Sequence, residues 1–147
     1  MWGIGARIGE LEPLALNTKF DEYGAIVNVN GKTGYRRVRS VWSVKYLKAW
    51  LEVHPENYNL EARLWVTTDS KEGSLKPLKY DAIRMQLKRL AKKSNINKRI
   101  HPHLFCHSRC TYMANYLTEA QMNEYFGWVQ GSGNFQTAFE PVAESID

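Results

Sequence analysis

The dipeptide Asn30-Gly31 constrains the fold of this chain more than any other feature, because it separates two runs of residues that favour extended structure. Gly24 to Val29 precedes the dipeptide, and Tyr35 to Val41 follows it. An Asn-Gly pair between two such runs is a strong short-range signal for a tight β-hairpin. The sequence therefore predicts a local antiparallel hairpin, with Lys32 at or beside its tip.

Helical periodicity is clearest between Lys79 and Lys93. Apolar residues recur there every three or four positions, which predicts one apolar helix face made of Tyr80, Ile83, Leu87 and Leu90. Shorter helices are expected over 7–16, 43–53, 103–116 and 118–127, and a short buried strand over 64–66. Several helices with one small antiparallel sheet predict an α+β fold.

The size and composition of the chain limit its organisation and its location. Its 147 residues suffice for one hydrophobic core but not for two. No apolar run approaches the roughly 18 residues that cross a bilayer, and no signal-peptide pattern opens the sequence. We therefore expect a single cytoplasmic domain with no membrane partner, in which Cys106 and Cys110 stay reduced.

Positive charge is concentrated before residue 110. Five acidic residues but no lysine or arginine follow Arg109, so residues 1–109 carry about +10 in a chain whose net charge is +5. Arg84, Lys88 and Lys92 repeat every four residues along one helix face. Such a stripe suits the phosphates of a nucleic acid, although a lysine-rich face that contacts only solvent is the alternative.

Four separated segments, taken in order, resemble the catalytic domain of tyrosine recombinases, the phage integrase family, of the archaeal type. The first three are Gly5 to Leu11, which contains Arg7; Asn30 to Gly34, followed by Arg36, Arg37 and Arg39; and His101 to Arg109, similar to the family's His-x-x-Arg box. The fourth, Glu124 to Trp128, resembles its Gly-His/Trp element. Order and spacing agree from Arg7 to about Gly131.

The resemblance implies a mainly helical DNA breaking-rejoining domain with a small antiparallel sheet. In this family a tyrosine attacks a backbone phosphate, leaving a 3′-phosphotyrosyl link and a free 5′-hydroxyl, and fixed donors stabilise the charged transition state. It assigns Arg7 to a phosphate clamp, Glu10 to orienting neighbours, Lys32 to protonating the leaving oxygen, His103 to donating or shuttling a proton, and Trp128 to packing beside a phosphate oxygen. The implied partner is double-stranded DNA, contacted by Arg36, Arg37, Arg39, Arg84, Lys88 and Lys92. We expect no metal and no cofactor.

Two departures from the family pattern affect the expected chemistry. Cys106 stands where the second arginine belongs, and a thiol has no fork of donors. The nucleophilic tyrosine should lie about ten residues after Trp128, near Ala138, but the window from Asn134 to Phe139 has none. Arg109, one helical turn beyond Cys106, is an alternative phosphate ligand. We therefore expect a catalytically inactive or impaired protein.

The resemblance also implies that an earlier helix and a separate amino-terminal domain of family members are missing. We expect an incomplete catalytic domain over residues 1–131, a divergent tail over 132–147, and marginal stability from uncovered apolar surface. The function expected is that of an integrase-family protein of site-specific DNA recombination and integration, catalytically inactive or impaired in this copy. The alternatives are a non-enzymatic DNA-binding protein and a partner of an intact recombinase.

Other interpretations of the same residues remain open at this point. His103, Cys106, His107 and Cys110 follow one another on a single helix face, and their side chains are of the types that bind zinc. A straight helix spreads these positions over two turns, however, and rarely supplies all four ligands. Cys106 with a histidine could also serve a hydrolase, although no acyl-site signature surrounds it. Taken singly, Arg7, Lys32 and Trp128 fit ordinary surface, turn and core roles.

Overall fold

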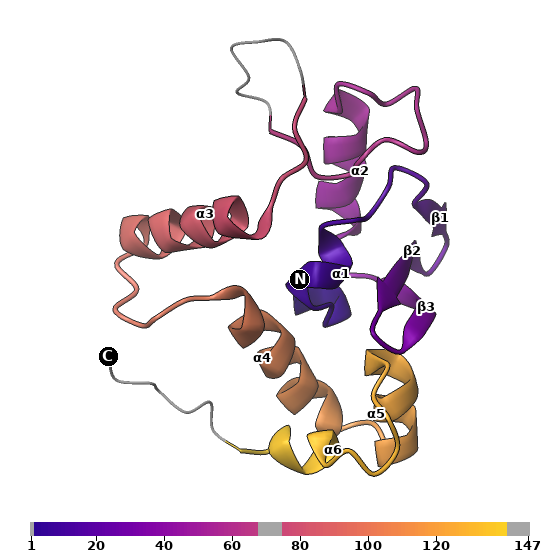
Figure 1. Ribbon diagram of the computed structural model, residues 1–147, viewed down its shortest axis with the longest axis vertical. Helices are drawn as coiled ribbons and strands as arrows, with labels where there is room; N and C mark the ends of the chain where they lie inside the picture. Colours follow the sequence, from indigo (N-terminus) through magenta and orange to yellow (C-terminus); the bar gives the residue numbers. More distant parts are fainter. Residues whose placement is uncertain (1, 68–74, 141–147) are drawn as a thin grey trace.

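The structure is a computed structural model that describes residues 2–67 and 75–140. The elements are η1 (Trp2–Ile4), α1 (Ile8–Leu11), β1 (Lys19–Asp21), β2 (Gly24–Gly31), β3 (Gly34–Ser40), α2 (Val44–Val53), α3 (Tyr80–Lys93), α4 (Pro102–Ala114), α5 (Glu119–Phe126) and α6 (Asn134–Thr137). Figure 1 shows the sheet with α1 and α2 in one half of the molecule, α4 to α6 in the other, and α3 to one side. The predicted α+β fold is confirmed.

The predicted hairpin is formed by β2 and β3, and β1 adds a third antiparallel strand beside β2. Pairing continues to Gly31 and Gly34, so the loop is Lys32-Thr33 and not Asn30-Gly31. Gly34 closes it with a φ of 104°, a conformation that side chains with a Cβ rarely adopt. Lys32 lies at the tip, as predicted. Strand β1 was not predicted, because it has only three residues and lacks a run of β-branched side chains.

Two predicted elements differ from the structure. The helix expected over 7–16 ends at Leu11, because Pro13 has no backbone N–H to continue the helical hydrogen bonds. Leu64 and Val66 are buried, but residues 64–66 do not form a strand. Instead, two isolated antiparallel bridges form in this part of the protein: Ala15 pairs with Arg63, and Val66 pairs with Pro77.

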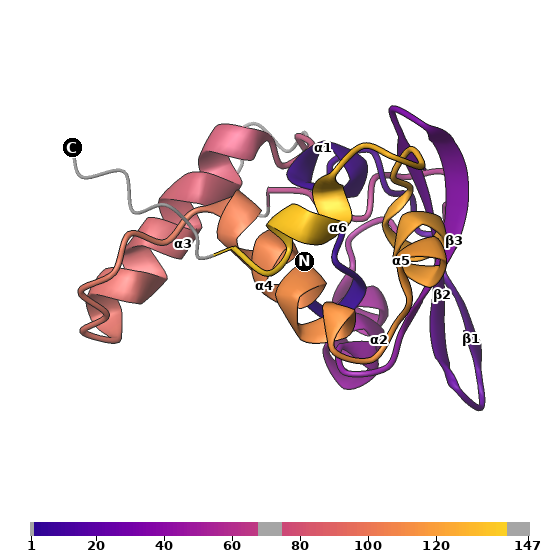
Figure 2. The same cartoon turned by 90° about the horizontal axis from the view of Figure 1, so that it is seen from below.

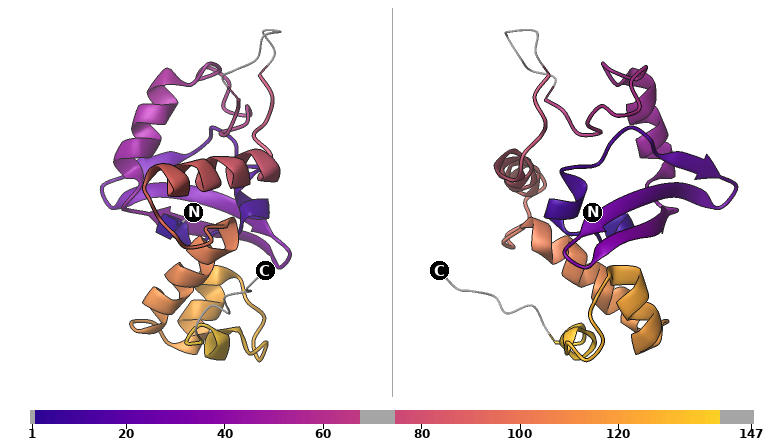
Figure 3. Two further views of the ribbon diagram at one scale, coloured as in Figure 1. Left: turned by 90° about the vertical axis from the view of Figure 1, so that its left-hand side faces the viewer. Right: turned by 45° about the vertical axis from the view of Figure 1, so that its right-hand side comes forward.

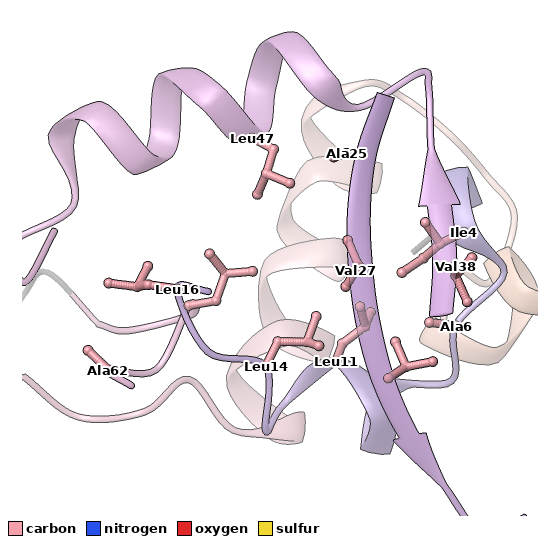
Figure 4. Close-up of a cluster of buried hydrophobic side chains, with 12 residues drawn as sticks. Ile4, Ala6, Leu11, Leu14, Leu16, Ala25, Val27, Val38, Leu47 and Ala62 are labelled. Atoms are coloured by element: carbon pink, nitrogen blue, oxygen red, sulfur yellow. The ribbon is translucent and has the colours of Figure 1, made fainter. Parts of the chain in front are cut away.

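The first hydrophobic core lies between the sheet, α1, α2 and the segment around Leu64. Figure 4 shows Val27 of β2 and Leu47 of α2 among its side chains, with Leu14 and Leu16 nearby. Alternation along β2 supplies this core, since successive side chains of a strand point to opposite faces. The core fixes the hairpin relative to α1.

The second core holds α4, α5 and α6 together and includes Cys106, Cys110, Met122, Phe126 and Ala138. Helix α5 begins with the predicted capping box, in which the Thr118 hydroxyl and the Gln121 side chain each bind the other residue's backbone N–H. By contrast, the Ser43 hydroxyl before α2 bonds to Ser40 and does not cap the helix. The domain boundary expected at residue 131 falls between α5 and α6, and residues 141–147 of the expected tail lie outside the described residues.

Helix α3 forms where the periodicity predicts it, but its expected apolar face is not a core face. None of its residues, all of which the structure describes, is buried. Leu90 is 58% exposed, whereas Ile83 and Leu87 are half-buried. Figure 2 shows α3 at the opposite end of the molecule from the sheet. No described helix combines the length and apolar character needed to span a membrane.

Candidate functional site

A cavity of about 160 Å³ lies where the segment before α1 meets α4 and the chain from Trp128 to Ala138. Arg7, His103, Cys106, Trp128 and Ala138 all line it, so the structure brings together five of the positions that the resemblance singles out. The other lining residues are His107, Cys110, Asn134 and Thr137. Since Arg7 and Ala138 are far apart in the sequence, the fold creates this site.

Arg7 is held at the cavity by the buried carboxylate of Glu10. The Arg7 backbone N–H donates to Glu10 Oε2 at 2.8 Å, and Arg7 Nη1 lies 4.0 Å from Glu10 Oε1. Burial acts to raise the pKa of Glu10, but hydrogen bonds from the Arg36 side chain and the Arg7 backbone, with the charges of both arginines, hold the pKa below its ordinary value. Glu10 is therefore a fixed anion beneath Arg7, whose side chain remains 38% exposed.

Lys32 lies beside the cavity and does not line it. Its neighbour Thr33 donates a hydrogen bond from Oγ1 to the carbonyl of Gly127 at 2.7 Å, so the hairpin tip lies next to the Gly127-Trp128 turn. Figure 3 shows the hairpin end directly above α5. Lys32 itself is exposed to solvent. The structure thus brings Arg7, His103 and Trp128 together around the cavity, and the hairpin tip that carries Lys32 lies next to the Gly127-Trp128 turn.

The Cys106 thiol is buried and donates its hydrogen bond within the protein. It donates to the carbonyl of Gly5 at 3.0 Å and is 8% exposed. A hydrogen bond from Cys110 lowers the pKa of Cys106, burial opposes this, and the charge of Arg7 adds to the lowering. The same hydrogen bond, together with burial, raises the pKa of Cys110.

The helix face that could have bound zinc does not form a metal site. Within residues 2–67 and 75–140, no three His, Cys, Asp or Glu side chains are grouped so that they could hold a metal ion. His103, Cys106, His107 and Cys110 do line the same cavity. They remain spread along two turns of α4, as their spacing implies.

Arg109 does not take the place of the missing arginine. It is 7% exposed, and its guanidinium carbon lies 5.5 Å from the centre of the Tyr112 ring. It is not among the residues that line the cavity. Its aliphatic part instead packs beside Gly5, whose carbonyl accepts the hydrogen bond from the Cys106 thiol.

A basic groove of about 920 Å³ lies between α3, the loop that follows it and the start of α4. Its cationic side chains are Arg84, Lys88 and Lys92 of α3 and Lys98 and Arg99 of the following loop. His103 lines both the groove and the cavity, so the two hollows share a wall.

The three arginines of β3 have different environments. Arg37 is exposed, whereas Arg39 pairs with Asp21 at 2.8 Å and lies over the Tyr23 ring. Arg36 binds the Glu10 carboxylate at 2.5 Å and has a side chain only 11% exposed. Sequence reasoning grouped the three as DNA contacts because the register of the strand was not known.

A family model described as the phage integrase family matches residues 1–132, which is most of the chain. The chain belongs to the phage integrase family. Solved structures of tyrosine recombinases share the fold of this integrase-family chain, including its helices and small sheet. No match was found among curated proteins.

Three solved structures illustrate the likeness in fold. A XerA recombinase matches with a TM-score of 0.75 and 23% identity, over 95% of this chain and 49% of that one. A XerH recombinase bound to difH substrate in a pre-cleavage complex matches with a TM-score of 0.68 and 17% identity, over 95% and 40%. The Tn1549 transposon integrase in complex with circular intermediate DNA matches with a TM-score of 0.68 and 20% identity, over 93% and 50%. The chain thus spans about half the length of these structures or less.

Proposed function

We propose that this integrase-family chain binds duplex DNA along the α3 groove and holds one backbone phosphate in the cavity without cutting the strand. The observation that carries the proposal is the shared wall at His103, which joins a groove lined by cations to a cavity lined by Arg7. A guanidinium can bind a phosphate through two parallel hydrogen bonds, and the indole N–H of Trp128 is a further donor type in the cavity. The recombinases XerH and Tn1549 integrase, which share the fold, were solved with DNA.

The position of Ala138 supports the proposal that the chain does not cut the DNA strand. It lines the cavity where the resemblance places the nucleophilic tyrosine, and a methyl group cannot attack phosphorus. Thr137 also lines the cavity, but its hydroxyl donates a hydrogen bond to the carbonyl of Asn134 at 3.0 Å. Among the residues that the structure describes, no tyrosine lines the cavity. A DNA duplex with a nick that traps covalent recombinase intermediates is therefore expected to give no covalent adduct with this chain. A stable protein–DNA adduct in a denaturing gel would show that another side chain supplies the nucleophile.

The test of DNA binding is the salt dependence of affinity for a duplex of arbitrary sequence. Each phosphate neutralised adds about 0.9 to the slope of log affinity against log salt, so removing three contacts should lower the slope by about three. The test variant replaces Arg84, Lys88 and Lys92 with alanine. The control replaces three exposed lysines of β1 and α2: Lys19, Lys45 and Lys48. A slope that both variants lower equally, or a flat wild-type response, would refute the proposal.

A finer proposal concerns the protein partner. A chain with a phosphate cavity but no nucleophile is suited to occupy DNA beside an intact recombinase protomer, and we propose that it does so in the cytoplasm. The expected result is a mixed complex on one DNA substrate, seen as a shifted band containing both proteins. Two separate bands at every ratio of the proteins would contradict this partner.

A further inference from the structure

We infer that Arg36 is a positioning residue that keeps Arg7 free to bind phosphate, because it occupies the carboxylate that would otherwise pair with Arg7. The inference rests on the proposed function for its effect on DNA binding. Its structural part, the competition of two arginines for Glu10, can be tested without DNA. Arg36 was expected to contact DNA directly, and the geometry points to a different role.

The Arg36 guanidinium uses all three of its nitrogens on the protein. Nη1 and Nη2 donate to the two oxygens of Glu10 at 2.5 and 2.9 Å, and Nε donates to the carbonyl of Tyr125 at 3.0 Å. This is the bidentate arrangement in which an arginine binds a carboxylate most strongly. The guanidinium therefore joins the hairpin to α1 and to the end of α5, next to Trp128.

Two arginines could pair with the Glu10 carboxylate, and Arg36 lies closer to it than Arg7 does. Arg36 Nη1 is 2.5 Å from Glu10 Oε1, whereas Arg7 Nη1 is 4.0 Å from the same oxygen. Arg7 lies three residues before Glu10 on the sequence, so its side chain is within reach of the carboxylate. If Arg36 were absent, the buried anion would be left without its main partner and would attract the Arg7 guanidinium away from the cavity.

Two glycines provide the space for this arrangement. A Cβ at Gly31 would lie 2.5 Å from Glu10 Oε1, and a Cβ at Gly127 would lie 2.9 Å from Thr33 Oγ1 and 3.3 Å from Arg36 Cδ. Neither contact leaves room for a side chain. The hairpin can therefore approach α1 and α5 closely enough for one guanidinium to reach both.

The neighbouring Arg37 provides a matched comparison. It carries the same charge on the same strand, but it is exposed, as expected when successive strand residues point to opposite faces. Replacement of Arg37 removes a charge without freeing Glu10. Replacement of Arg36 removes a charge and frees Glu10, so the two arginines should respond differently to a second substitution at Glu10.

The experiment is a pair of double-mutant cycles read by duplex DNA affinity at fixed salt. Arg36→Gln is expected to weaken binding by about tenfold, and Glu10→Gln added to it is expected to recover most of that loss, because no carboxylate remains to hold Arg7. Glu10→Gln added to Arg37→Gln should give no recovery. If the double variant Glu10→Gln, Arg36→Gln binds no better than Arg36→Gln alone, the inference is overturned.

A second readout uses the free protein. Phenylglyoxal modifies accessible guanidinium groups, and the rate at Arg7 can be followed by peptide mass analysis. Arg36→Gln should slow the modification of Arg7, and the added Glu10→Gln should restore it. If Arg7 is modified at the same rate in the wild type and in Arg36→Gln, the inference is refuted. If the Arg7 rates are as expected but the protein does not bind DNA, only the proposed function is refuted. Should Arg36→Gln not fold, Arg36→Met, which also removes the charge, takes its place in the cycle with Glu10→Gln and in the modification assay, and no recovery on adding Glu10→Gln is again the contrary result.

Discussion

At the scale of single residues, the proposed function assigns the cavity one phosphate ligand, Arg7, and two positions, Cys106 and Ala138, without the functional groups expected from the family. Arg7 lines it with a partly exposed guanidinium, whereas the Cys106 thiol is turned to the carbonyl of Gly5. Loss of one preorganised donor costs about 2.7–4 kcal/mol of transition-state stabilisation, so Cys106 alone would slow any cleavage about a hundred- to thousand-fold. In the proposed function, Ala138 supplies no attacking atom. The proposal thus assigns ligand binding and bond cleavage to different positions of one cavity.

Gly5 is the residue at which backbone conformation matters most for this site. Its φ is +61°, and an added Cβ would collide with the Phe126 ring. We expect Gly5→Ala to lower the free energy of unfolding by about 1–3 kcal/mol, measured by urea denaturation. Gly9→Ala is the matched control, because Gly9 lies in α1 with nothing within 4 Å of its added Cβ. It should raise stability by about 0.5–1 kcal/mol, and equal losses for the two variants would contradict the argument.

Glu10 should make stability depend on pH in the acid range. Its pKa is lower in the folded protein than in the unfolded chain, so its contribution is present above the unfolded pKa and is lost as the pH falls through the folded pKa. The difference in unfolding free energy between wild type and Glu10→Gln should therefore be largest at neutral pH and narrow below about pH 4. Urea denaturation at several pH values measures this. The exposed Glu22→Gln is the control, and a difference that stays constant with pH for Glu10→Gln would count against the ion pair.

At the scale of elements, α3 is held by few buried contacts and is free to present its basic face. Leu90 is 58% exposed, while Leu64 in the first core is 1% exposed. Leu64→Ala should cost about 2–5 kcal/mol of unfolding free energy, and Leu90→Ala less than about 1 kcal/mol. Thermal or urea unfolding checks both values. A large loss from Leu90→Ala would mean that α3 packs more tightly than the structure indicates.

The sequence predicted the elements that have strong local signals. The hairpin was predicted from its two extended runs and the Asn-Gly signal between them, although its loop lies at Lys32-Thr33. Helix α5 was predicted from its capping box, and α3 from its periodicity. What local signals could not give was burial, because the apolar stripe of α3 looks like a core face whether or not another element covers it. The early end of α1 did have a signal in Pro13, which sequence reasoning did not use.

At the scale of the whole molecule, the candidate site depends on contacts between distant segments. The expected meeting of Arg7, His103 and Trp128 came from a family resemblance, since no local pattern links these positions. The bridge from Arg36 to Glu10 was missed because it needs the register of β3 and the approach of the hairpin to α1, and neither can be read from spacing. The same holds for the bond from Thr33 to Gly127 that places Lys32 beside the cavity.

The central claim is that the cavity beside Arg7 receives a phosphate of duplex DNA, and the affinity of Arg7→Ala tests it most directly. Arg63→Ala is the control, because Arg63 is exposed and lines neither the cavity nor the groove. Loss of a charge-assisted bidentate contact should weaken duplex binding about ten- to hundredfold for Arg7→Ala, measured by fluorescence anisotropy, and leave Arg63→Ala within about twofold of wild type. Equal affinities for the two variants would contradict the account.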